Sequence, residues 1–257
     1  MGSITPHPVP NALYVFPETF PDGVSQPRVC DFDDMVLRLV KWQPSVHGLT
    51  PTYSELAASR LGQLIEAPVV RGTIVYVEPA LLPEALAQRL TQPFHIGFTF
   101  SPGQNFRETD YAQIKNTASL PAAAVQLAWL QIADQERHNQ FLYQLEQVLP
   151  DRTTRKMSHF ILIDQAFICG IPDWSSAALD HPESSYSLPR HLRPQVSMAS
   201  LDPLIGLVGS LDSDAIHRCF DTYPESWNIG ADLVEKVTDY MLRRRAHLGD
   251  ILRANFP

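Results

Sequence analysis

Hydrophobic residues in the first part of the chain form short runs separated by turn-forming residues. Val36–Lys41 and Phe94–Phe100 alternate between apolar and polar positions, and Val69–Val77 is rich in β-branched side chains, so these segments predict strands. Ser54–Ile65 instead repeats its apolar residues at helical spacing, which predicts an amphipathic helix with Glu55 in its first turn. A small sheet accompanied by one helix is therefore expected here.

The remainder of the chain is predicted to be mainly helical. Pro121–Ile132 is an apolar helical segment, Leu142–Leu149 is expected to add a short helical continuation, and Phe160–Ile163 has the composition of a strand. Residues 172–194 are rich in Ser, Pro, Asp and His and predict a long loop. Further helices are predicted at Pro79–Leu90, Leu201–Leu211, Ala215–Phe220 and Ala231–Leu252.

These elements predict an α+β protein with three parts. Residues 1–20 are rich in proline and are expected to form an arm with little structure of its own. Residues 21–105 are expected to form a small lobe that contains the sheet, and residues 106–257 a mainly helical lobe. At 257 residues, the chain is long enough to bury a substantial core.

Candidate chemistry follows the apolar helix. Asp134 and Asn139 stand close together in one polar loop, and Asp164 follows the strand Phe160–Ile163. Kinases use an Asp to orient the acceptor hydroxyl, and an Asn and a second Asp to hold Mg²⁺ with ATP. Asp and Asn are common residues, so this spacing becomes useful only if the phosphate-binding half of a kinase is also present.

That second half is predicted upstream. Lys41 ends a strand, and Glu55 lies on the helix that follows, which is how kinases orient a lysine toward the α and β phosphates. Before the strand, a turn containing Gly23, Ser25 and Gln26 offers backbone donors that could cradle phosphate oxygens. The order of these parts along the chain, more than any one of them, favours a kinase.

Several short segments together resemble one known family. They are Gly23–Pro27, Leu39–Lys41, Ser54–Gly62, Glu136–His138, Ile163–Phe167, Tyr223–Trp227 and Tyr240–Arg245. They look like segments of the bacterial HipA-like kinases, whose fold is distantly similar to that of protein kinases and phosphatidylinositol kinases. The resemblance implies an α+β, two-lobed kinase-like fold with a small β-containing N-lobe and a mainly helical C-lobe.

The resemblance also implies an activity and a role for each site residue. The activity is ATP-dependent transfer of the γ-phosphate to a hydroxyl, with ATP and Mg²⁺ as cofactors. Lys41, held by Glu55, would bind phosphates, and the turn from Gly23 to Gln26 would close over them. Asn139 and Asp164 would hold Mg²⁺, and Asp134 would orient the acceptor. A protein Ser or Thr is the acceptor that the family suggests, and a small-molecule alcohol stays open.

The polar loop departs from the family pattern, in which an Asp precedes Arg-His and an Asn follows three residues after the His. Here Glu136 precedes Arg137, and Phe141 occupies the position of the Asn. One register therefore makes Glu136 the catalytic carboxylate beside Arg137. The other keeps the Asp134-to-Asn139 distance, and we prefer it because loop geometry sets the distance between base and metal ligand.

A second departure follows Asp164, where Gln165 and Ala166 replace the usual His-Gly. Losing a glycine leaves a loop less free to adopt positive φ. Both departures keep open an alternative: a catalytically weak or inactive pseudokinase that acts as a nucleotide- or protein-binding module.

The composition argues against some classes of binding partner. A formal net charge of −8 and a pI near 5.5 argue against broad binding to nucleic acid or anionic membranes, which require a basic face. The three cysteines are scattered and lack zinc spacing, which suits a reducing compartment. No stretch approaches the length of a membrane span, so the cytoplasm is the expected location.

The residues complete neither a zinc site nor a serine hydrolase site. Asp134 and His138 are at helical spacing and could share a metal with Glu136 or His159, but no second closely spaced His pair completes a zinc set. A Ser hydrolase would need a G-x-S-x-G turn, which the chain lacks.

Overall fold

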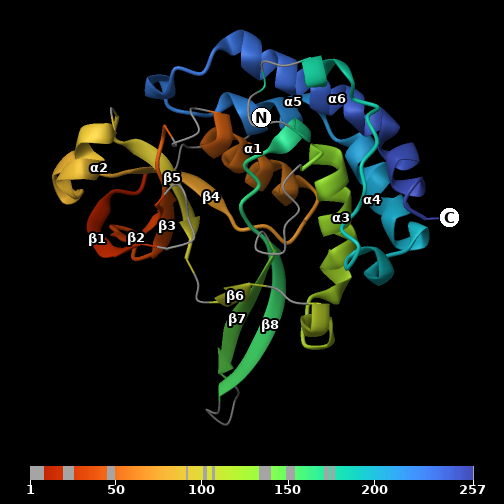
Figure 1. Ribbon diagram of the computed structural model, residues 1–257, viewed down its shortest axis with the longest axis horizontal. Coiled ribbons are helices and arrows are strands. Elements are labelled where there is room, and N and C mark those ends of the chain that lie inside the picture. Colours follow the sequence, from red (N-terminus) through yellow and green to blue (C-terminus); the bar gives the residue numbers. More distant parts are fainter. Residues whose placement is uncertain are drawn as a thin grey trace.

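The computed structural model describes residues 9–19, 26–44, 50–90, 92–100, 103–105, 108–132, 140–148, 154–170, 174 and 177–256. An antiparallel sheet of five strands occupies one end of the molecule, in the order β1-β2-β3-β5-β4 (Figure 1). Its strands are β1 (Ala12–Thr19), β2 (Arg28–Phe32), β3 (Arg38–Lys41), β4 (Gly72–Tyr76) and β5 (Phe94–Thr99).

The structure differs from the expected proline-rich arm with little structure of its own at residues 12–19. Ala12–Thr19 forms β1, and its register against β2 is interrupted by irregularities. Pro17 is tolerated because β1 is an edge strand, where one side of the backbone needs no partner. The chain is also joined to the opposite edge of the sheet, since Pro10 accepts a hydrogen bond from the backbone of Tyr76.

Helix α1 (Thr50–Leu64) follows β3 and lies between the sheet and the helices of the C-terminal part (Figure 1). It begins earlier than predicted, so Glu55 lies beyond the first turn. Nearly all of its middle residues are buried, because one side packs on the sheet and the other on helices. The opposite face of the sheet is covered by helix α2 (Glu84–Arg89), where Leu86 packs with Val40 and Trp42.

A second antiparallel sheet, in the order β6-β7-β8, projects below the rest of the molecule in Figure 1. Its strands are β6 (Gly103–Asn105), β7 (Gln140–Val148) and β8 (Thr154–Leu162). The helical continuation predicted at Leu142–Leu149 is therefore wrong. Along its full length β7 pairs with β8, and these cross-strand bonds are not visible in the local sequence pattern.

The remaining part is helical, as predicted. Its helices are α3 (Leu120–Leu130), α4 (Met198–Ser210), α5 (Ser213–Asp221) and α6 (Ala231–Arg253). One hydrophobic core runs from α1 through α3 to these C-terminal helices. The segment before α4 is anchored to this core by Arg244, which is fully buried and donates to the carbonyls of Pro182 and Ser184 at 2.8 and 3.0 Å.

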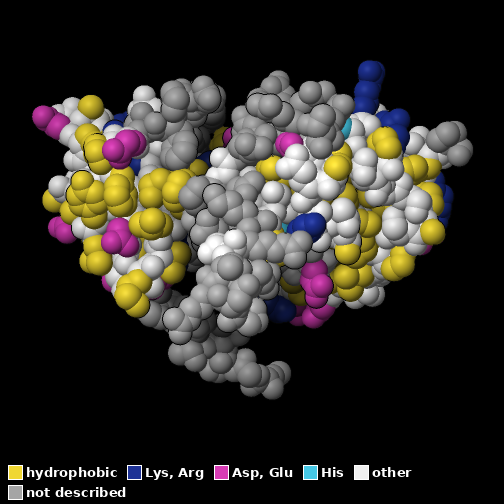
Figure 2. Space-filling view, turned by 90° about the horizontal axis from the view of Figure 1, so that it is seen from below, with side chains coloured by type: hydrophobic (Ala, Val, Ile, Leu, Met, Phe, Trp, Pro, Cys, Tyr) yellow, Lys and Arg dark blue, Asp and Glu magenta, His cyan; other side chains and the backbone are white. Residues whose placement is uncertain are grey.

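Hydrophobic side chains are visible on the surface at the end of the molecule that carries the five-stranded sheet (Figure 2). Most of the large hydrophobic side chains that are exposed among the described residues belong to this part: Val9, Leu13, Tyr14, Met35 and Leu37. Leu207 of α4 is the exception.

Candidate active site

Three charged side chains from distant parts of the sequence meet between the sheet and the helical part. The ammonium of Lys41 lies 2.6 Å from Glu55 Oε2 and 2.7 Å from Asp164 Oδ1. Lys41 and Glu55 are largely buried, whereas the side chain of Asp164 is 48% exposed. Asp164 thus faces solvent at the edge of a buried ion pair, where a ligand can reach it.

The fold explains why these side chains meet. Lys41 is the last residue of β3, and the strand alternation places Leu39 and Lys41 on the face opposite Val40. That face is covered by α1, so Glu55 on the helix can reach the ammonium. Asp164 follows the end of β8 and has a φ of 54°. A non-glycine residue rarely adopts positive φ, and such strain is often found at functional sites.

Lys41 forms ion pairs with two carboxylates, and these charges shift the pKa values of the site. Burial disfavours a charged ammonium, but Glu55 and Asp164 outweigh it and hold the pKa of Lys41 above its ordinary value. Burial raises the pKa of Glu55 to about 7, because Lys41 only partly offsets desolvation and the nearby Asp164 charge adds to it. The cluster has one negative charge in excess when Glu55 is ionised and is suited to a further cation.

A buried amide network supports the segment that carries Asp164. Gln126 of α3 is fully buried, and its Nε2 atom donates to Gln165 Oε1 at 2.7 Å and to the Ala58 carbonyl at 3.0 Å. The network thus joins α3 and α1 to the residue next to Asp164. Gly62 lies directly beneath the amide, since a Cβ there would come 2.2 Å from Gln126 Oε1.

Apolar side chains lie beside the charged cluster on the same face of the sheet. Leu39 and Phe98 are paired across β3 and β5, and Val29 is paired with Leu39 from β2. All three are partly exposed. The Lys41 ammonium lies 5.9 Å from the centre of the Phe98 ring. An apolar wall next to a cationic group suits a planar base attached to phosphates.

Of the site residues predicted from sequence, the structure brings Lys41, Glu55 and Asp164 together. Asp134, Glu136, Arg137, Asn139, Gly23 and Ser25 lie outside the described residues. Gln26 is described, and its carbonyl accepts a hydrogen bond from the Trp42 indole at 2.9 Å.

The β7–β8 register locates the end of the polar loop. Gln140, which directly follows Asn139 in the chain, is paired with Leu162, and Asp164 lies two residues beyond Leu162. The loop therefore joins the sheet at the end where Asp164 lies. The absence of a glycine after Asp164 does not strain the backbone there, because Ala166, which replaces that glycine, is not among the described residues with positive φ.

Sequence analysis missed Gln126, Gln165 and Phe98 as parts of this site. A signal for Gln126 was present: it is the only side chain with a polar group within Leu120–Leu130 apart from the indole of Trp129, and an amide in an apolar helix needs a buried hydrogen-bond partner. Phe98 was placed on a predicted strand, but its neighbour Leu39 belongs to a strand far earlier in the chain, and local pattern does not show such pairing.

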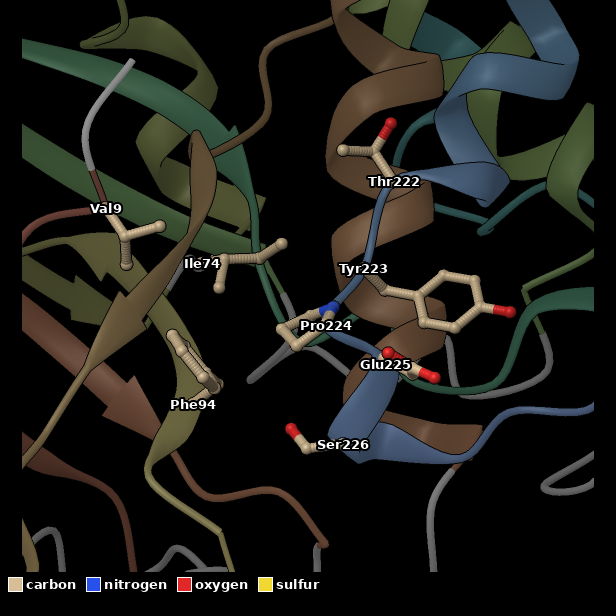
Figure 3. A pocket seen from close by; sticks show the side chains of 8 residues that line it. All are labelled: Val9, Ile74, Phe94, Thr222, Tyr223, Pro224, Glu225 and Ser226. Carbon is tan, nitrogen blue, oxygen red and sulfur yellow. The ribbon is translucent and has the colours of Figure 1, made fainter. Parts of the chain in front are cut away.

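Other hollows lie apart from the charged cluster. One of them has a volume of about 430 Å³ and is lined in part by Ile74, Phe94 and the segment Thr222–Ser226. Figure 3 shows Ile74 and Phe94 facing this segment. The indole of Trp227 donates to the Phe94 carbonyl at 3.0 Å and ties that segment to the sheet.

Among the described residues, no group of three or more His, Cys, Asp or Glu side chains could hold a metal, and no helix is long and apolar enough to cross a bilayer.

No protein-family model matches the chain, and no curated protein matches it by sequence. Solved structures do match. A proinflammatory kinase of Helicobacter pylori, CtkA, is 11% identical with a TM-score of 0.62, over 96% of this chain and 98% of that one. The Golgi casein kinase, solved alone and with Mn/ADP, is 10% identical with TM-scores of 0.54 and 0.53, over 96% of this chain and 74% of that one.

The fold is kinase-like. The comparisons confirm the predicted α+β, two-lobed architecture, with the antiparallel sheet in the N-terminal part and helices in the C-terminal part. At such low identity the likeness establishes the fold alone.

Proposed function

We propose that this protein is an ATP-dependent kinase that transfers the γ-phosphate to a hydroxyl. The observation that carries the proposal is the position of Lys41, within 2.7 Å of both Glu55 and Asp164, in a kinase-like fold. A lysine held by a helix glutamate and facing a solvent-accessible aspartate is the arrangement by which kinases bind the phosphates and the metal of Mg-ATP.

Each residue then has a role. Lys41 binds the α and β phosphates, and Glu55 fixes the direction of its ammonium. Val29, Leu39 and Phe98 would form an apolar wall for the adenine. Gly23, Ser25 and Gln26 would cover the phosphates.

The metal-binding residues would be Asp164 and Asn139. The Asp164 carboxylate fits a hard divalent cation, because it is accessible and, with Glu55 ionised, lies in a cluster with one negative charge in excess. Bound Mg²⁺ neutralises charge on the phosphates. One relative by fold was solved with Mn/ADP, which supports the use of a divalent metal and a nucleotide.

Asp134 orients the acceptor hydroxyl, with Glu136 and Arg137 as the alternative register. Catalysis rests on positioning and on charge neutralisation, without a covalent enzyme intermediate. We infer a protein Ser or Thr as acceptor and a HipA-like relationship. The sequence segments that resemble the HipA-like kinases support both.

A nucleotide- or protein-binding pseudokinase is the second candidate. It is favoured by Gln165, whose amide is engaged in the buried Gln126 network, and by Glu136 at the position of the family's catalytic Asp. The two candidates differ in whether bound nucleotide is ever consumed.

The test is transfer of labelled γ-phosphate to the protein itself and to a cell extract. We expect Asp134→Asn to abolish transfer and to retain Mg-ATP binding, because the side chain would touch the acceptor and not the nucleotide. If Glu136→Gln has this effect instead, the other register holds. Mg-ATP binding by the wild type without any transfer would favour the pseudokinase, and transfer unaffected by either variant would place the catalytic loop elsewhere.

A further inference from the structure

A second hollow, of about 340 Å³, lies on the helical part of the protein and is lined by Tyr111, Arg190, His191, Pro194 and Gln195. Its lining combines the polar side chains of Arg190 and Gln195 with the aromatic rings of Tyr111 and His191. The Tyr111 ring stacks on Phe160 of β8, with an interplanar angle of 19°. Together these contacts place the hollow between β8 and the segment that precedes α4.

The hollow lies at the same end of the second sheet as the proposed metal ligand. His191 Nε2 is 2.6 Å from Gln140 Oε1, and Gln140 is buried. Gln140 is paired with Leu162, two residues before Asp164, and it directly follows the polar loop in the chain. A molecule in this hollow would therefore lie beside the end of the loop in which Asp134 is proposed to orient the acceptor.

Arg190 gives the hollow its charge. Its side chain is exposed, and it has no ion pair or hydrogen bond in the part of the chain that the structure describes. Other arginines on this side of the molecule are engaged: Arg193 donates to the Leu188 carbonyl, and Arg244 is buried. An unpaired guanidinium in a concave, partly aromatic site is suited to a carboxylate, which it can bind with two parallel hydrogen bonds.

We propose that this hollow binds a carboxylate side chain of the acceptor peptide, so that the acceptor is a Ser or Thr in an acidic sequence. The proposal rests on the proposed kinase function. The segment turns after Pro189, whose carbonyl accepts from the backbone of Leu192, and forms a short 3-10 helix at Arg193–Gln195, with Arg190 and Pro194 exposed.

A carboxylate fits better than a phosphate. Arg190 is the only Lys or Arg that lines the described part of the hollow, and the Nε2 atom of His191 is already hydrogen-bonded to Gln140. A phosphate carries close to two negative charges and is usually held by several cationic groups. One arginine matches the single charge of a Glu or Asp.

The test is binding of fluorescein-labelled peptides, measured by anisotropy at low salt without nucleotide. One peptide carries Ser among Glu residues, and matched peptides carry Gln, Lys or phosphoserine in place of Glu. We expect the Glu peptide to bind about tenfold more tightly than the Gln peptide, as one charge-assisted pair allows. Arg190→Ala should remove this preference, and Arg190→Glu should shift it to the Lys peptide.

The matched control is Arg89→Glu, because Arg89 is an exposed arginine on α2, which covers the far face of the five-stranded sheet. It should retain the wild-type preference. Equal binding of the Glu and Gln peptides by the wild type, or an unchanged preference in Arg190→Glu, would overturn the proposal. Tighter binding of the phosphoserine peptide would overturn the assignment to a carboxylate.

Calorimetry with Mg-ATP on the same proteins separates the two hypotheses. If the wild type prefers the Glu peptide through Arg190 but binds no Mg-ATP, the kinase function fails and the anion site stands. If Mg-ATP binds and no peptide preference is found, the site fails and the kinase function stands.

Discussion

Replacing Glu55 with Gln should change how the stability of the protein depends on pH. The pKa of Glu55 is raised from 4.5 to about 7, so the folded state holds this proton more tightly than the unfolded state. The contribution of Glu55 to the free energy of unfolding is fully present below pH 4.5 and is lost as the pH rises toward 7. At about 1.4 kcal/mol per pH unit, that loss amounts to roughly 3 kcal/mol.

A second buried group has the opposite effect. Burial lowers the pKa of His95 from 6.5 to about 4, and its Nδ1 atom accepts a hydrogen bond from the Gln43 backbone. The contribution of His95 to the free energy of unfolding is fully present above pH 6.5 and is lost as the pH falls toward 4. In the wild type the two contributions should nearly cancel between pH 4.5 and 6.5, which leaves a flat profile from these groups.

Glu55→Gln removes one of the two contributions and keeps the shape of the side chain. Relative to the wild type, the variant should gain roughly 3 kcal/mol in its free energy of unfolding between pH 4.5 and 7.5. The measurement is urea denaturation at several pH values in that range. Because His95 is common to both proteins, its effect cancels in the difference.

Glu235→Gln serves as the matched control, since Glu235 is exposed on α6 and its replacement should give a profile parallel to that of the wild type. Parallel profiles for Glu55→Gln and the wild type would refute the reasoning. They would mean that Lys41 keeps Glu55 ionised at an ordinary pKa.

Three further predictions concern the packing around α1. Gly62→Ala should destabilise the protein by about 1 to 3 kcal/mol in urea, because the new Cβ would come 2.2 Å from Gln126 Oε1; an unchanged midpoint would refute this close contact. Gln126→Leu keeps the volume but leaves Gln165 without its donor, so we expect a weaker Mg²⁺ dependence of nucleotide binding by calorimetry, and an unchanged dependence would show that the network does not position the Asp164 segment. Tyr53→Phe should lower stability by about 1 to 2 kcal/mol in urea, since it leaves the Phe220 carbonyl without its buried donor, and no loss would contradict that hydrogen bond.

Sequence reasoning succeeded where a feature is local. The alternation that ends at Lys41, the helical spacing around Glu55 and the apolar run before Asp164 each depend on neighbouring residues, and the structure has an element at each place. It failed at Ala12–Thr19 and Gln140–Val148, which are strands because of partners elsewhere in the chain.

In the charged cluster, too, the sequence predicted the residues but not the contacts between them. Its members could be chosen from residue type and order, but their contact depends on α1 crossing the sheet and on β8 ending beside it. The amide network of Gln126 could not be placed, since its partners lie on α1 and after β8. Packing between distant elements decides such contacts, and a single sequence does not encode it in a local pattern.

The most direct test of the account is calorimetric titration with Mg-ATP of the wild type and of Lys41→Met, with Lys236→Met as a control for an exposed lysine on α6. We expect the wild type and the control to bind Mg-ATP alike, and to bind ATP more weakly when Mg²⁺ is removed. Lys41→Met keeps most of the side-chain volume but loses the charge that would contact the phosphates, so its affinity should fall at least tenfold. Equal affinity in all three proteins, or no binding by the wild type, would contradict a nucleotide site at Lys41, Glu55 and Asp164.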